Sequence, residues 1–358
     1  MPKRRADLDK LASGLEKDDL ILLVAIAVST VVGILAPSFG IIFEPYLLIL
    51  LGCLLFLNLI KMDPQELALQ FKHPIPIVLL TAIKLLVIPL ILYATTNMIY
   101  PSLAIPVLLL SGISTGLGAP FVMNVFEKSH QLPLVVGMII SSSIIVPFVL
   151  PSLVYFLVDF EKFNIPFIDM TILLAEALFL PLFVGWLVKS KAPKIAKKIE
   201  SGSFIPSVIL VSLMNLGIYA KFSNYFISEY SFVITMIIAA FALFFVYGSI
   251  GYFTSYIIGK KDKSSHIASF VIMSYINNTL VVVFASQFFG TEVAALAAFY
   301  NLAYYGLMVP MKKLFLSTSL QHLFRYLFNK FKIRRTKVFC NNKKRIMLIL
   351  FLNHLTYI

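Results

Sequence analysis

Two stretches of the chain place helix-breaking and polar residues inside otherwise apolar runs. Gly116, Gly118 and Pro120 lie in the first, within 113–126, and two adjacent amides lie in the second, within 273–284. Glycine permits sharp turns, and proline removes an amide donor. At membrane depth, irregular backbone is tolerated only where it is buried in protein or lines a wet cavity. Because broken helices in two halves of a chain build the substrate sites of many carriers, the pattern predicts such a site.

The candidate binding residues of these stretches are Gly118, Ala119, Pro120, Phe121, Asn277, Asn278 and Thr279. An unwound first stretch would offer carbonyls to a cation or amide donors to a ligand, whereas the alternative is a close-packed helix crossing that needs small residues. The buried amides of the second stretch must find partners, so they either contact a substrate or brace the crossing.

Three consecutive serines, Ser141, Ser142 and Ser143, extend the candidate set. They point around a predicted helix, so at least one faces the interior of a helix bundle. Each either lines the site or bonds the carbonyl four residues back.

Two charged residues lie deep in apolar segments. Lys84 precedes Pro89 by five residues, and Glu176 precedes Pro181 by five. An ionisable residue near the bilayer midplane is a functional candidate by default. The alternative for Lys84 is that its ammonium extends to the membrane surface. If Lys84 and Glu176 met, each would neutralise the other, and the pair would be a candidate for coupling transport to protons.

The elements that must hold these residues are membrane-spanning helices. Hydrophobic residues make up 59% of the 358-residue chain and charged residues 13%, against roughly 25% charged in soluble domains. A span needs about 20 apolar residues. The sequence therefore predicts an all-α membrane protein with ten transmembrane helices, at 20–37, 42–60, 75–97, 103–126, 132–158, 166–188, 204–220, 231–258, 266–289 and 292–311.

Basic residues fall unevenly on the two sides that ten spans define. Up to Lys313, eighteen Lys and Arg residues lie on one side and two, Lys162 and Lys221, on the other. The longest basic connection is 189–203. Because cytoplasmic connections carry the excess of Lys and Arg, we expect both termini to be cytoplasmic, in an integral protein of the cell (inner) membrane with lipid around it. The net charge of +13 thus follows topology and does not indicate a nucleic-acid partner.

The predicted regions are a cytoplasmic segment at 1–19, a membrane domain at 20–315 and a basic tail at 316–358. Nine basic residues among Phe, Leu and Tyr make the tail either an amphipathic segment on anionic lipid or a disordered basic extension. Cys53 and Cys340 show neither disulfide nor metal-ligand spacing. No phosphate-binding loop occurs either, so we expect no metal, no cofactor and no ATP-driven step.

The two halves of the predicted spans are similarly spaced, and the fifth span of each contains a Val-Pro pair, Val146-Pro147 and Val309-Pro310. Since five is odd, the second half must enter the membrane from the opposite side. The sequence therefore predicts two inverted five-helix repeats.

Four strings carry a resemblance to a known family: 58–63 followed by Pro74, Lys-Leu-Leu-Val-Ile-Pro at 84–89, Leu-Pro-Leu-Phe-Val-Gly at 180–185 and Asn-Asn-Thr at 277–279. In their order and spacing, the chain resembles the bile acid:sodium symporter family over about 20–315. The resemblance implies a panel domain of spans 1, 2, 6 and 7 and a core domain of spans 3–5 and 8–10. It further implies that discontinuous helices 4 and 9 cross in the core, that core and panel move for alternating access, and that the substrate is a small organic anion or amphipathic organic acid.

The chain departs from the sodium ligands that the resemblance implies. Met273 stands where the family has a glutamate, Asn277 and Lys84 stand at glutamines, and Pro120 and Phe121 stand near a Ser-Asn pair. Sodium needs hard oxygen ligands, which a methionine does not supply, and an ammonium repels it. We therefore expect Lys84 to act as a built-in cation or an anion contact, which argues against bound sodium.

The residues and the resemblance together predict a secondary active transporter of a small organic anion or amphipathic organic acid, similar to the sodium-coupled bile acid symporters. The alternatives are a carrier of the same fold that is proton-coupled or uncoupled, with Lys84 replacing sodium, and a non-transporting receptor or assembly subunit. The sequence does not define the substrate or the oligomeric state.

Overall fold

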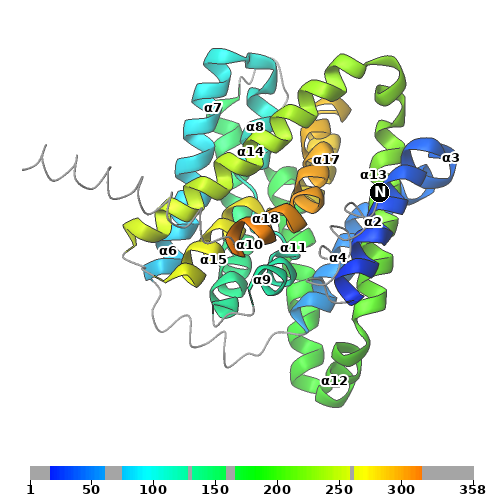
Figure 1. Ribbon diagram of the computed structural model, residues 1–358, viewed down its shortest axis with the longest axis vertical. Coiled ribbons are helices and arrows are strands. Elements are labelled where there is room, and N and C mark those ends of the chain that lie inside the picture. The colour runs from blue at the N-terminus through cyan, green and yellow to red at the C-terminus, as the bar shows by residue number, and fades with distance from the viewer. Residues whose placement is uncertain (1–16, 61–74, 128–130, 159–165, 259–261, 317–358) are drawn as a thin grey trace, which may run out of the picture. The chain divides into compact units, whose positions relative to one another are not determined.

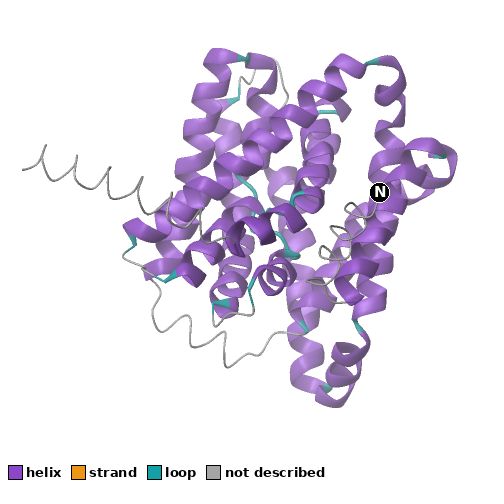
Figure 2. Ribbon diagram, viewed as in Figure 1, coloured by secondary structure: helices purple, strands orange, loops and turns teal. Residues whose placement is uncertain are grey.

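The computed structural model describes residues 17–60, 75–127, 131–158, 166–258 and 262–316. Within these ranges the chain is helical, with one isolated bridge and no strand (Figure 2). The predicted all-α membrane class is confirmed. Most of the predicted N-terminal segment and tail, and the basic residues of the connections at 61–74, 128–130, 159–165 and 259–261, lie outside the described residues.

The helices of the first half are α2 (Lys17–Leu35), α3 (Pro37–Gly40), η1 (Ile41–Tyr46), α4 (Leu47–Leu59), α6 (Ile75–Ala82), η2 (Ile83–Val87), α7 (Ile88–Ile99), η3 (Pro101–Leu103), α8 (Ala104–Ser111), α9 (Ala119–Phe126) and α10 (Leu132–Leu157). Those of the second half are α11 (Phe167–Lys191), α12 (Pro193–Gly202), α13 (Phe204–Ser228), α14 (Tyr230–Ile257), α15 (Lys263–Ser274), α16 (Asn278–Phe288), α17 (Thr291–Gly306) and α18 (Met308–Leu316).

Six described helices are long and apolar enough to cross a membrane, and a seventh counts if α17 and α18 are taken as one span. The six lie at Pro37–Asn58, Ile75–Ile99, Leu132–Leu157, Phe167–Lys191, Phe204–Phe226 and Tyr230–Ile257. Two of the other predicted spans, 103–126 and 266–289, are interrupted, so neither forms one long helix. The ten-span count therefore stays a prediction.

Contacts divide the chain into one unit at Met1–Met308 and another at Val309–Ile358. In the first unit, α13 packs along α2, α3 and α4, and α4 also packs along α11. In the same unit, α16 packs along α17. Helix α14 packs along α15 and α17, and α7 packs along α8 (Figure 1). In the second unit the described residues, 309–316, lie in α18.

Two predicted connections between spans contain helical residues. The basic connection at 189–203 is largely helical, because α11 continues to Lys191 and α12 follows at once. Helix α12 buries Ala196 and exposes its lysines, which is the pattern of a surface helix. Lys221, assigned to a connection, lies in α13, and its Nζ is 2.6 Å from Glu44 Oε1 of η1.

Candidate binding site at the helix crossing

Both predicted interruptions are present. Helix α8 ends at Ser111 and α9 begins at Ala119, so the residues between them, 112–118, are not helical. Helix α15 ends at Ser274 and α16 begins at Asn278, which leaves only 275–277 between them. The first interruption coincides with the glycines and the second ends at the paired amides, as their sequence patterns predict.

The two interruptions pair with each other through their backbones. Thr115 and Ile276 form an antiparallel bridge. The Gly116 amide donates to the Tyr275 carbonyl at 2.7 Å, and the Asn277 amide donates to the Ser114 carbonyl at 3.0 Å. Each unwound segment therefore supplies hydrogen bonds that the other would lack in a bilayer.

The two segments approach so closely at residue 116 that only glycine fits there. A Cβ atom at this position would lie 2.4 Å from the carbonyl oxygen of Ile276, which is backbone and has no room to move aside. No other residue fits without separating the two segments.

Lys84 reaches the crossing from a third element. Its Nζ donates to the carbonyl of Ile272 at 3.1 Å and to that of Met273 at 3.4 Å, both in the last turn of α15. The side chain is 2% exposed, so it does not extend to the membrane surface. It projects from η2, a π-helical turn just before Pro89. The C-terminal end of a helix carries partial negative charge, which favours an ammonium there.

The remaining carbonyls at the end of α15 also have donors. The Thr115 hydroxyl donates to Ile272 at 3.1 Å, and the Tyr300 hydroxyl donates to Ser274 at 2.7 Å. The amide of Gly116 covers the next carbonyl along the chain. Every carbonyl from 272 to 275 therefore accepts a hydrogen bond from outside α15.

Glu176 does not meet Lys84, so the proposed charge pair is wrong. The Glu176 side chain is exposed on α11, and the structure records no ion pair between these two described residues. Its neighbours one turn away, Ile172 and Leu180, are 47% and 63% exposed. The opposite face of α11, with Leu174 and Leu178 fully buried, packs on α4 and α10.

The three serines have different environments. The Ser142 hydroxyl accepts the Thr115 amide at 3.1 Å and donates to the Met138 carbonyl at 2.5 Å, so it supports the unwound segment. Ser141 donates to the Gly137 carbonyl of its own helix at 2.6 Å. Ser143 is buried, and its hydroxyl has no partner in the described structure.

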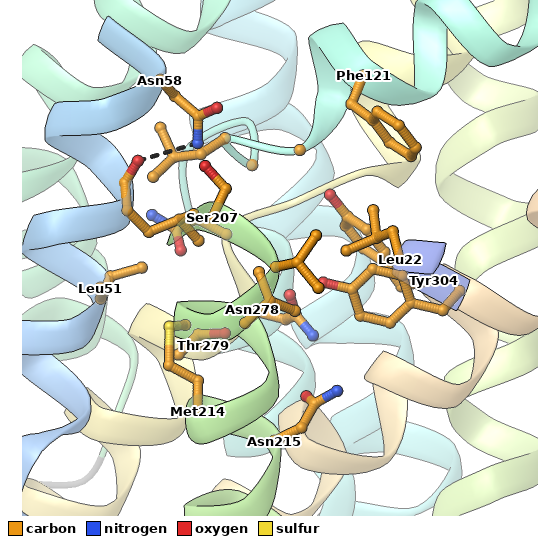
Figure 3. A pocket seen from close by; sticks show the side chains of 18 of the residues that line it. Leu22, Leu51, Asn58, Phe121, Ser207, Met214, Asn215, Asn278, Thr279 and Tyr304 are labelled. Atoms are coloured by element: carbon orange, nitrogen blue, oxygen red, sulfur yellow. Dashed lines mark hydrogen bonds between the residues drawn. The ribbon is translucent and has the colours of Figure 1, made fainter. Parts of the chain in front are cut away.

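A cavity of about 130 Å³ lies beside the crossing and is lined by residues of α2, α4, α9, α13, α16 and α17 (Figure 3). Its lining includes five of the predicted site residues: Gly118, Phe121, Asn277, Asn278 and Thr279. The other predicted residues, Lys84, Ala119, Pro120, Ser141, Ser142 and Ser143, do not line it. Lys84 is thus at the crossing but makes no contact with the cavity.

Sequence reasoning missed the polar residues that α4, α13 and α17 contribute to the cavity. Asn58, Ser207, Asn215 and Tyr304 line it, and Figure 3 shows the Tyr304 hydroxyl directed toward Asn278. Asn215 carried a usable signal, because it is an isolated amide in the middle of an apolar run. Which helix packs against the crossing was not readable from the sequence.

The cavity is rich in hydrogen-bond donors. The Nδ2 atoms of Asn215 and Asn277 have no hydrogen-bond partner among the described residues, and the two residues are only 3% and 5% exposed. By contrast, Asn278 donates to Asn301 Oδ1 at 2.5 Å and braces α16 against α17. The N-terminal ends of α9 and α16 also lie at the cavity, through Gly118 and Asn277. Helix N-termini carry partial positive charge and attract anions.

Comparison with known protein families identifies the family of this chain. The model of the Sodium Bile acid symporter family matches residues 48–229, which is half of the chain. The chain belongs to that family. A search of curated proteins found no match. Members of the sodium bile acid symporter family are membrane transporters, and the matched region includes Lys84, the first interruption and Asn215.

Proposed function

We propose that the protein is a secondary active transporter that moves a small organic anion or amphipathic organic acid across a cell membrane by alternating access. The observation that carries the proposal is a largely apolar cavity with a few polar groups, placed beside two paired helix interruptions, which is where carriers hold substrate near the midplane. Membership of the sodium bile acid symporter family supports it.

Ten spans in two inverted repeats are part of the proposal. The six long helices, the two interrupted pairs α8–α9 and α15–α16, and the helices α2 and α17 together supply ten elements. The helices α2, α4, α11 and α13 would form the panel, and the rest would form the core. The cavity lies between elements of these two groups, so their relative movement would open it first to one side and then to the other.

An anionic substrate fits the cavity for electrostatic reasons. The unpartnered amide donors of Asn215 and Asn277 match the oxygens of a carboxylate or sulfonate, and two helix N-termini add positive potential. Phe121, Phe204 and Leu51 supply apolar surface for the rest of the molecule. Small-molecule sites combine an apolar lining with a few placed polar groups in this way.

Uptake into proteoliposomes tests the proposal, with radiolabelled taurocholate and a short-chain monocarboxylate as probes. Asn215→Asp keeps the side-chain shape, adds negative charge and should weaken anion uptake by tenfold or more, since about 1.4 kcal/mol is a factor of ten. Asn215→Leu removes the donor and should weaken it less. Asn224→Asp, on the same helix but exposed, should leave uptake unchanged.

A receptor or assembly subunit predicts a different result. Such a protein would bind one of the probes saturably in detergent without moving it across the bilayer. Equal uptake by empty and protein-containing liposomes for every probe, together with saturable binding, would therefore replace the transport proposal with a binding role.

A further inference from the structure

The family name implies sodium as a coupling ion, and the residues at the crossing do not fit it. Broken-helix carriers hold their cations on unwound carbonyls and on the C-terminal ends of half-helices. In this chain the C-terminal end of α15 is that position. Lys84 Nζ already donates to its carbonyls at Ile272 and Met273.

We propose that the Lys84 ammonium is a tethered cation that occupies this carbonyl site, so that the protein works without sodium bound there. The proposal accounts for three facts together. Lys84 is buried, and no carboxylate of the described residues forms an ion pair with it. Its ammonium group donates hydrogen bonds to backbone carbonyls. An ammonium offers three donors and one positive charge, which meets the needs of those oxygens.

The oxygens that remain do not make a sodium site. The carbonyls from 272 to 275 accept hydrogen bonds from Lys84, Thr115, Tyr300 and Gly116. Met273 lies at the same turn, and its side chain, which lies beside Gly251 of α14, has no oxygen to offer a hard cation. A sodium ion about 4 Å from the ammonium would meet a repulsion of about 4 kcal/mol at an effective dielectric near 20, equivalent to a loss of affinity of roughly a thousandfold.

Sodium binding can be measured on the purified protein without a transport assay. The binding of ²²Na⁺ in detergent and the melting temperature in NaCl against choline chloride, at equal ionic strength, give two readings. For the unaltered protein we expect no saturable binding and equal melting temperatures. Saturable binding would overturn the proposal, because the ion would then share the crossing with Lys84, for example at the unpartnered hydroxyls of Ser114 and Ser143.

Lys84→Gln removes the tethered charge and offers an oxygen in its place. We expect this variant to melt lower than the unaltered protein in choline chloride and to recover part of the loss in NaCl. Equal melting temperatures in the two salts would overturn the assignment of these carbonyls as a cation site. Lys194→Gln, on exposed α12, should show neither effect.

The tethered-cation proposal rests on the proposed transport function only where it concerns the coupling of transport to an ion. Experiments can therefore contradict the two proposals separately. If sodium binding is absent and no probe is transported, the tethered cation stands and the transporter proposal falls. If probes are transported and sodium binds at the crossing, the transporter proposal stands and the tethered-cation proposal falls. Uptake that is equal in sodium and choline buffers would support both.

Discussion

At the scale of single residues, Ser141 and Ser142 show how adjacent side chains of one kind take different roles. Ser142 accepts the Thr115 amide from another element, whereas Ser141 only bonds a carbonyl of its own helix. The difference depends on which side of α10 faces the unwound segment. The sequence predicted that at least one serine would face the bundle, and it did not predict which.

Ser142→Ala should destabilise the protein, and Ser141→Ala should not. The first change leaves a buried backbone N–H without a partner, which costs about 1–3 kcal/mol. The second removes a hydroxyl whose carbonyl partner belongs to an ordinary helical turn, so we expect less than about 0.5 kcal/mol. Thermal unfolding of both variants in the same detergent compares them. Equal melting temperatures would show that Ser142 does not support the crossing.

At the scale of elements, the crossing of α8–α9 with α15–α16 depends on backbone pairing more than on side-chain packing. The two amide-to-carbonyl bonds and the antiparallel bridge require the unwound segments to approach closely. Gly116 permits this approach, since a Cβ there would lie 2.4 Å from the Ile276 oxygen.

Gly116→Ala should therefore separate the two segments. Overpacking a well-packed interior usually costs about 1–3 kcal/mol, and the loss of the paired hydrogen bonds adds to that. The control is Gly202→Ala, where an added Cβ meets nothing within 4 Å and a helical alanine should be neutral or slightly stabilising. Melting temperatures in detergent measure both, and a Gly116→Ala protein as stable as the control would contradict the pairing.

The interruptions and their pairing could be predicted because their cause is local. Glycine, proline and paired amides inside apolar runs leave the backbone few alternatives, and an interrupted helix must find partners in a bilayer. The same reasoning identified Lys84, because a buried ammonium group needs a partner in any fold. The sequence did not identify that partner. Glu176 was an equally deep charge, but the face that α11 turns inward depends on packing against α4 and α10.

The residues that line the cavity were also hard to predict, because they depend on how the helices pack. Asn277 and Asn278 are neighbours in the chain, and the sequence shows them as a pair. Asn215 comes to the same cavity from α13, and only the tertiary packing of α13 against α2 and α4 brings it there. Residues that share one segment are therefore predicted well, and residues that share only a cavity are not.

At the scale of the whole membrane unit, the cavity lies toward the ends of helices that carry basic residues. Asn58 is near the end of α4, shortly before Lys61, and Ser207 lies in the first turn of α13, directly after basic α12. By the distribution of Lys and Arg, both ends are expected at the cytoplasmic face. We therefore expect the cavity of the described conformation to face the cytoplasm, as in the inward-facing state of the proposed alternating-access carrier.

Thiol labelling tests this orientation. In a background in which Cys53 and Cys340 are replaced by serine, Ser207→Cys should react with a membrane-impermeant maleimide in inside-out vesicles and not in right-side-out vesicles. Met98→Cys, at a position that is 86% exposed near the far end of α7, should react only in right-side-out vesicles. Labelling of both cysteines from one side would contradict the topology. Labelling of Met98→Cys as expected with Ser207→Cys unreactive from either side would instead mean that the cavity is closed in the resting protein, and the inward-facing assignment would be wrong.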